Sequence, residues 1–177
     1  MKKHLFFSLV CLLGLSACSS EHIALDAMKV YDVVNSACKL NLSETDTQPD
    51  IYETNIVKPA SLSLQLEGDG IVKGVLEDVK GNCAVRKIHV QIANDDNKIM
   101  LVVYHDKLEA LADCICNYDV NFKISKLPAG AYKLKVYYAN PAKKYDASSL
   151  AYDGRIALTL DKKTSVTLKS PMILPVN

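Results

Sequence analysis

The chain has 177 residues, with 21 basic and 20 acidic side chains, a formal net charge of +1 and no tryptophan. This balanced charge excludes the strongly basic surface that nucleic-acid-binding domains use, so we expect no nucleic-acid partner. The length fits a single domain with a sizeable core.

The first residues have the pattern of a secretory leader. Lys2 and Lys3 precede an apolar run that ends near Leu15, and small residues follow it. The run is too short to span a bilayer as a helix, which takes about 20 residues. We therefore expect an exported chain with a signal peptide over residues 1–17 and a tether over residues 18–25.

The sequence Leu15-Ser16-Ala17-Cys18 resembles the lipobox of bacterial lipoproteins. The resemblance implies that Cys18 is lipidated and begins the mature chain, which carries 19 basic and 20 acidic side chains. Several acyl chains anchor firmly, since each buried methylene contributes about 0.8 kcal/mol. Ser19 and Ser20 do not resemble the aspartate that retains lipoproteins in the inner membrane. We therefore expect an outer-membrane anchor, with periplasmic and surface exposure both open.

Two segments precede the strand-rich part of the chain. Residues 24–38 have mixed apolar spacing, which leaves helix and strand both open. Residues 41–55 are rich in Ser, Thr, Asp, Gln and Pro, which predicts a loop.

From residue 61 onward, apolar and polar residues alternate with a period of two, as in strands with one buried face. Turn signals separate the alternating segments, at residues 68–70, 94–97 and 128–130. Residues 99–104 form a continuous apolar run, which predicts a strand buried on both faces. Residues 156–160 and 166–168 are expected to form a last hairpin around residues 161–163. The pattern predicts one all-β sandwich of about seven or eight strands over residues 26–177, immunoglobulin-like or transthyretin-like.

The order Leu-x-x-Gly-x-Tyr-x-Leu over residues 127–134 resembles the strand entry of immunoglobulin-like and transthyretin-like sandwiches. In those folds the tyrosine ring covers the edge of the core and its hydroxyl returns to the backbone, a tyrosine corner. The resemblance implies an architectural role for Tyr132.

Six cysteines are present, of which Cys11 leaves with the leader and Cys18 carries lipid. The four that remain favour disulfides in an exported chain, and they are Cys38, Cys83, Cys114 and Cys116. A bond between Cys114 and Cys116 would close a very small ring with poor geometry. Cys114 and Cys116 should therefore each pair with Cys38 or Cys83. We favour a bond between Cys83 and either Cys114 or Cys116. Strand parity places both thiols on the face of Tyr118.

A metal site is the alternative use of the same residues. Cys83, Cys114 and Cys116 with His105 would make a Cys3His ligand set. However, Cys-x-Cys is not the common Cys-x2-Cys knuckle, and an oxidising compartment competes for the thiols. The Cys-x-x-Cys pattern of thioredoxin-like proteins is also absent. We therefore expect disulfides, no cofactor and no redox role.

Three elements together resemble small Bacteroidota lipoproteins of uncharacterised function. They are Gly81-Asn82-Cys83, the Cys-x-Cys-x-Tyr-Asp order of residues 114–119, and residues 127–134. In those relatives a second adjacent cysteine often stands where this chain has Ala84, so a pairing does not transfer. The resemblance implies a fold and a phylum, but no activity.

No catalytic motif stands out. There is no Gly-x-Ser-x-Gly elbow and no His-Glu-x-x-His pair. His89 with Ser61 or Ser63 is the nearest approach to a base and nucleophile, and solvated serines on a polar strand face are the simpler interpretation. Asp95-Asp96 lacks the ligand pattern of a calcium loop and predicts a hairpin tip. We therefore expect that the chain is not an enzyme.

Two sets of residues suggest binding. Tyrosine is favoured at interfaces, so Tyr137, Tyr145 and Tyr152 are candidates for a protein-binding patch. Solvated lysines are expected on one outer face, at Lys123, Lys133 and Lys135. The sequence predicts a non-enzymatic binding or scaffolding domain with an envelope protein partner. The alternatives are a metal-binding accessory component of an envelope enzyme or transport system, and a purely structural envelope protein.

Overall fold

The computed structural model describes residues 28–39, 58–95, 97–169 and 173–177. The strands in these ranges are β1 (Val30–Asn35), β2 (Ser61–Leu66), β3 (Val72–Asn82), β4 (Ile88–Asp95), β5 (Lys98–His105), β6 (Ile115–Ile124), β7 (Gly130–Tyr138), β8 (Leu150–Leu158) and β9 (Lys163–Thr167), with one short 3-10 turn, η2 (Ala147–Ser149). The leader, Cys18, the tether and the predicted loop over residues 41–55 lie outside the described residues. Within the described ranges, no helix is long and apolar enough to cross a bilayer.

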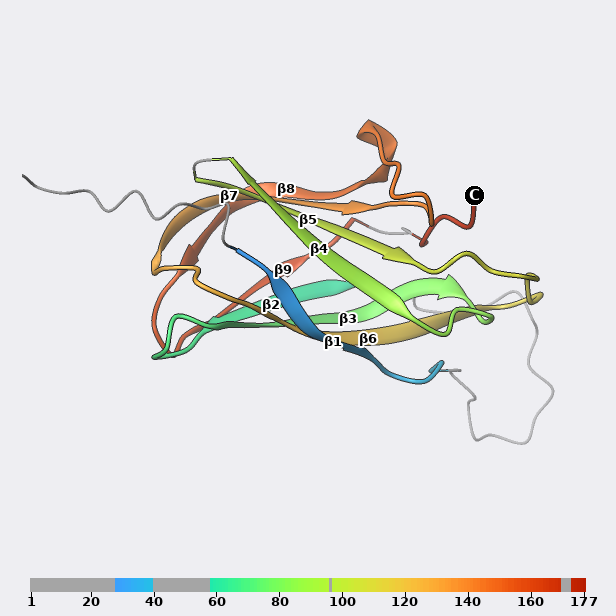
Figure 1. Ribbon diagram of the computed structural model, residues 1–177, viewed down its shortest axis with the longest axis horizontal. Helices are drawn as coiled ribbons and strands as arrows, with labels where there is room; N and C mark the ends of the chain where they lie inside the picture. Colours follow the sequence, from blue (N-terminus) through green and yellow to red (C-terminus); the bar gives the residue numbers. More distant parts are fainter. Residues whose placement is uncertain (1–27, 40–57, 96, 170–172) are drawn as a thin grey trace, which may run out of the picture.

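Two sheets pack face to face, which confirms the predicted β-sandwich (Figure 1). The five-stranded sheet has the order β1-β6-β3-β2-β9, and the four-stranded sheet has the order β4-β5-β7-β8. Neighbouring strands are antiparallel except for β5 and β7, which run parallel. The described residues contain nine strands rather than the predicted seven or eight.

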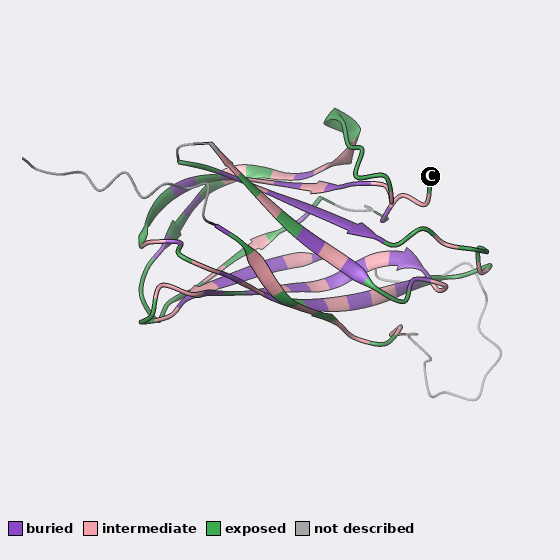
Figure 2. Cartoon of the chain, viewed as in Figure 1, coloured by how far each residue is buried: buried purple, intermediate pink, exposed green. Residues whose placement is uncertain are grey.

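Alternation along the strands builds the core between the sheets. In β6, the side chains at every second position from Cys116 to Ile124 are buried, and the residues between them are not fully buried. Figure 2 shows the same alternation of buried and partly exposed positions along the central strands. Each fully buried large apolar side chain contributes about 1.5–3 kcal/mol. Phe122 lies directly over Gly74 of β3, where any Cβ atom would meet its ring.

The segment that the sequence left open between helix and strand forms β1. It pairs antiparallel with β6, with Val30 opposite Ile124 and Asn35 opposite Val120. The register shifts between Tyr31 and Val34, where Asp32 has a φ of +52°. This irregularity explains why the apolar spacing of the segment fits neither a regular helix nor a regular strand.

The predicted last hairpin is wrong. β8 pairs with β7 in the four-stranded sheet, whereas β9 pairs with β2 in the five-stranded sheet. The chain changes sheet between them, with Leu160 bridging to Leu66 and Asp161 at a φ of +56°. Two alternating runs around a polar turn look the same in sequence whether the chain folds back within a sheet or crosses to the other one.

β5 is buried on both faces, as its apolar run predicts. Ile99, Leu101 and Val103 belong to the core between the sheets. On the outer face, Val102 and Tyr104 form a second small cluster with Ala139, which follows β7. The excursion between β7 and β8 therefore covers part of the outer face of the four-stranded sheet.

Candidate functional site

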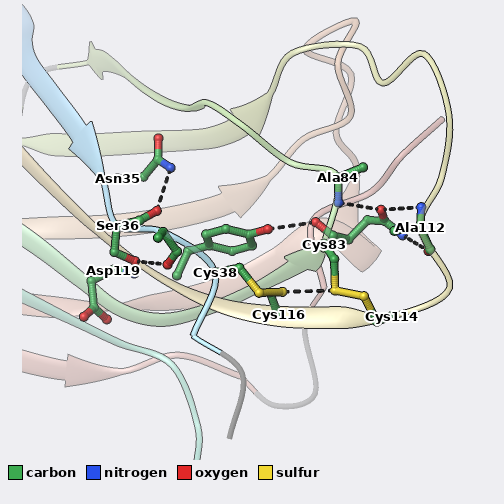
Figure 3. The surroundings of a disulfide bond; sticks show 12 residues. Asn35, Ser36, Cys38, Cys83, Ala84, Ala112, Cys114, Cys116 and Asp119 are labelled. Atoms are coloured by element: carbon green, nitrogen blue, oxygen red, sulfur yellow. Dashed lines mark hydrogen bonds between the residues drawn. A yellow bond between two sulfur atoms is a disulfide. The ribbon is translucent and has the colours of Figure 1, made fainter. Parts of the chain in front are cut away.

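The four cysteines of the domain form two disulfides, Cys38–Cys116 and Cys83–Cys114. Cys116 is buried within β6, whereas Cys114 precedes the strand and is exposed. The sequence analysis placed both cysteines on the buried face of Tyr118. This is correct for Cys116 but wrong for Cys114, because the alternation of faces does not extend beyond the end of the strand. The two bonds lie side by side, with the Sγ atoms of Cys116 and Cys83 only 3.0 Å apart (Figure 3).

Asn82 organises the chain around this cluster. Its side-chain oxygen accepts hydrogen bonds from the backbone N–H groups of Ala84 and Ala112, and its amide donates to the carbonyl of Ala112 at 2.6 Å (Figure 3). The Cys83 N–H donates to the carbonyl of Cys114 at 3.1 Å. Two of the three elements that the sequence analysis grouped, the Asn-Cys and the Cys-x-Cys elements, are therefore directly connected.

A charged cluster lies at the bulge of β3. Asp78 has a left-handed backbone (φ +57°) and is 7 % exposed, and its carboxylate contacts Lys39 at 2.8 Å and Lys58 at 2.9 Å. Lys39 also contacts Asp119 at 2.6 Å. Burial pushes the pKa of Asp78 up, but its contacts with the two lysines outweigh burial and hold that pKa below its usual range. The cluster joins the segment after β1 to β3 and β6.

The alternative metal ligand set, Cys83, Cys114, Cys116 and His105, makes other contacts in this structure. The sulfur atoms of Cys38, Cys83 and Cys116 lie within 4.8 Å of one another. All are consumed in disulfides, so they lack the thiolates that coordinate a metal. The buried ring of His105 faces backbone carbonyls, with Nδ1 2.6 Å from Asp106 O and Nε2 3.0 Å from Pro175 O.

The serines and His89 do not come together as a catalytic pair. His89 lies on the outer face of the four-stranded sheet, stacked on Tyr104 and 2.7 Å from Asp106. Ser61 belongs to the five-stranded sheet and donates a hydrogen bond to Glu77 of the same sheet. Ser63 is buried against Ser165 rather than solvated, which corrects the expectation of an exposed hydroxyl.

A hollow of about 490 Å³ lies on the outer face of the four-stranded sheet. Its walls come from β4, β5 and β7, and they include Ala93, Asn94, Lys98, Met100, Lys133, Lys135 and Tyr137. The parallel register of β5 and β7 sets Lys98 beside Lys133 and Met100 beside Lys135. Along the hollow, the Lys98 and Lys133 pair is therefore followed by Met100 beside Lys135, and Tyr137 comes next along β7.

Asp153 of β8 lies between two of these lysines. Its carboxylate oxygens are 3.4 Å from Lys133 Nζ and 3.5 Å from Lys135 Nζ. The attraction of Asp153 raises the pKa of Lys135, which keeps that lysine charged. Two lysines share one carboxylate, so the three side chains together carry a net positive charge. The sequence analysis expected Lys123 on the same face as Lys133 and Lys135, and this expectation is wrong. Lys123 lies in β6 of the other sheet and pairs with Asp32.

Two of the three predicted patch tyrosines meet at this hollow. The rings of Tyr137 and Tyr145 are 4.7 Å apart, and the Tyr145 hydroxyl lies 3.6 Å from the Met100 sulfur. The third, Tyr152, packs against the core between the sheets instead. Tyr145 comes from the excursion, where Asp146 caps the η2 turn by accepting hydrogen bonds from Ser148 and Ser149.

A smaller hollow of about 330 Å³ lies beside the loop after β5. Its charged lining is mixed, with Arg86, Lys87 and Lys107 against Asp106 and Glu109. Its two acidic side chains offset two of its three basic ones, so the hollow between β4, β5 and β7 is the stronger candidate for a binding site. Sequence reasoning missed that hollow as a unit, because the parallel pairing of β5 with β7 leaves no local signal.

The Tyr132 hydroxyl donates to the carbonyl of Pro128 at 2.8 Å, four residues upstream. This contact has the geometry of a tyrosine corner.

Comparison with known proteins gave no match to any family model, to any curated protein or to any solved structure.

Proposed function

We propose that this chain is a lipid-anchored binding domain of a bacterial cell envelope, and that the hollow between β4, β5 and β7 receives part of a protein partner. The observation that carries the proposal is the grouping of Lys98, Lys133 and Lys135 with Met100 and Tyr137 in one hollow. Methionine and tyrosine are enriched at protein interfaces, where they supply adaptable apolar area.

The charge distribution favours a partner segment that carries carboxylates. The lysines of the hollow complement an acidic group, and Met100 and Tyr137 complement an apolar side chain next to it. Such a partner would bind more weakly as salt increases, because exposed charges are screened over about 8–10 Å.

The anchor belongs to the same proposal. Acylation of Cys18 in the lipobox would tether the domain to the outer membrane through the short segment that precedes β1. A tether raises the effective concentration of the domain toward other envelope proteins, so a modest intrinsic affinity is sufficient. A domain that scaffolds or captures a neighbour needs no catalytic centre.

The anchor is tested by growing cells that express the full chain with an alkyne-labelled fatty acid. We expect label on the wild-type chain and none on Cys18→Ser. Label on both chains, or on neither, would contradict the assignment of Cys18.

The binding surface is tested by co-purifying the full chain from detergent-extracted envelopes. The variant Lys133→Glu/Lys135→Glu reverses the charge of the hollow, and Tyr137→Ser removes its aromatic wall. Both should lose the partner that the wild type retains. Lys163→Glu, an exposed position of β9 in the other sheet, is the matched control and should retain it. Equal recovery with all variants would reject this face.

A further inference from the structure

The two disulfides are arranged as a chain of four sulfur atoms. The order is Cys38, Cys116, Cys83 and Cys114, with bonds within the two outer pairs and a 3.0 Å contact between the inner two atoms. In the view of Figure 3 the four sulfurs follow one another in a row. A thiolate breaks a disulfide by attacking one of its sulfur atoms directly, so this contact places Cys83 where such an attack begins.

The two outer cysteines of this row differ in exposure, since Cys114 is exposed and Cys38 is half-buried. The inner Cys116 is only 1 % exposed. A thiol from solvent therefore reaches the Cys83–Cys114 bond first, and the Cys38–Cys116 bond is shielded at its Cys116 end. Accessibility governs which disulfides exchange.

We propose that the four cysteines form a thiol–disulfide exchange site whose substrates are dithiols of small molecules or proteins. An incoming thiolate attacks Cys114 Sγ, forms a mixed disulfide there, and releases Cys83 as a thiolate. The Cys83 thiolate attacks Cys116 Sγ, forms a Cys83–Cys116 bond, and releases Cys38 as a thiolate.

The second thiol of the substrate then resolves the mixed disulfide and releases Cys114. The substrate leaves oxidised as its own disulfide, having supplied two electrons. The protein keeps one disulfide, Cys83–Cys116, and carries thiols at Cys38 and Cys114. The proposal departs from the expectation based on the missing Cys-x-x-Cys pattern, because the fold rather than the sequence spacing brings the exchange partners together.

The backbone keeps Cys83 beside Cys116 after the Cys83–Cys114 bond opens. β3 and β6 are paired up to the cluster, with Gly81 opposite Cys116 and Asn82 opposite Ile115. The Tyr118 hydroxyl also donates to the Asn82 carbonyl at 3.0 Å. Cys83 therefore stays beside Cys116 independently of its bond to Cys114.

Cys38 can be released without losing its place. The Cys38 segment is held by the bridge of Lys39 to Asn117 and by the contacts of Lys39 with Asp78 and Asp119. The exchange therefore changes the covalent link between the end of β1 and β6 while the strands stay paired.

The test compares two single variants of the full chain, without added reductant. Cys114→Ser leaves Cys83 as the unpaired cysteine, and Cys83→Ser leaves Cys114 unpaired. Each protein is alkylated under denaturing conditions, and the labelled peptides are identified by mass spectrometry. We expect label on Cys38 as well as Cys83 in Cys114→Ser, and on Cys114 alone in Cys83→Ser. Label confined to Cys83 in the first variant would overturn the proposal.

A second measurement uses the wild-type chain and does not depend on how the variants fold. A limiting amount of dithiothreitol is added, and samples are alkylated at successive times. We expect the species that has lost one disulfide to carry label on Cys38 and Cys114. Label on Cys83 and Cys114, or on Cys38 and Cys116, would show that the bonds open independently and would reject the relay.

Discussion

The hydroxyl of Tyr118 donates a hydrogen bond to the backbone carbonyl of Asn82 at 3.0 Å, in the buried interior. This bond joins two short elements that stand out in the sequence, the Asn-Cys at the end of β3 and the Cys-x-Cys-x-Tyr-Asp at the start of β6. The tyrosine, the asparagine and the two disulfides therefore act as one node that closes this end of the five-stranded sheet.

Tyr118→Phe should lower the free energy of unfolding by about 1 kcal/mol, which is the usual net value of a hydrogen bond. The loss stays modest because the Asn82 carbonyl also accepts a hydrogen bond from the Val85 N–H at 3.0 Å. Urea denaturation followed by circular dichroism measures the change. Tyr145→Phe, at a residue that is 41 % exposed, is the control and should change stability by less than about 0.5 kcal/mol. Equal effects of the two variants would contradict the proposed role of the Tyr118 hydroxyl.

Tyr138→Phe should raise the free energy of unfolding, in contrast to Tyr118→Phe. Tyr138 is fully buried, and its hydroxyl has no hydrogen-bond partner among the described residues. Burial raises the pKa of this phenol, as expected for a group far from water. A buried hydroxyl without a partner costs about 1–3 kcal/mol in lost hydration, so its removal should raise stability by about 1 kcal/mol in the same denaturation assay. A loss of stability would indicate that the hydroxyl has a partner, such as a buried water.

Asp78→Asn tests the charged cluster at the β3 bulge. Asparagine tolerates the left-handed backbone of this position, so the variant removes the charge with little added strain. We expect a loss of about 1–2 kcal/mol at neutral pH, less than for a fully buried pair because Lys39 is 37 % exposed. Asp78→Ala should lose more, since alanine adds backbone strain.

The pH dependence of this effect follows from the lowered pKa of Asp78. The folded state holds the carboxylate ionised at a lower pH than the unfolded chain does, so the unfolded state binds more protons in that range. The contribution of Asp78 is therefore fully present above about pH 4, near the unfolded pKa, and is lost as the pH falls through the folded pKa. The stability difference between wild type and Asp78→Asn should shrink on acidification. A difference that grows at low pH would contradict this account.

The sequence predicted the fold class well, because period-two alternation and turn residues are local signals. It predicted β5 as doubly buried from its apolar run, and residues 68–70 as a turn, where Gly70 has a φ of +77°. It misplaced β9, since the choice of sheet depends on which strand edge is free rather than on the β9 residues themselves.

The candidate site was only partly predictable for the same reason. The alternation of Lys133, Lys135 and Tyr137 places these residues on one face, and the structure keeps them together. Their meeting with Lys98 and Met100 depends on a parallel strand pair between distant segments. The disulfide pairing was likewise open, because Cys38 and Cys83 are both brought to β6 by strands of the same sheet.

The central claim, that the hollow binds a protein partner, is tested most directly by photo-crosslinking in living cells. Ala93, an exposed residue in the wall of the hollow, is replaced by p-benzoylphenylalanine in the full chain, and Thr167 of β9 is replaced in the same way as the control position. We predict a discrete protein adduct at position 93 that disappears with Lys133→Glu/Lys135→Glu and is absent at position 167. No adduct at position 93, or the same adducts from both positions, would contradict the claim.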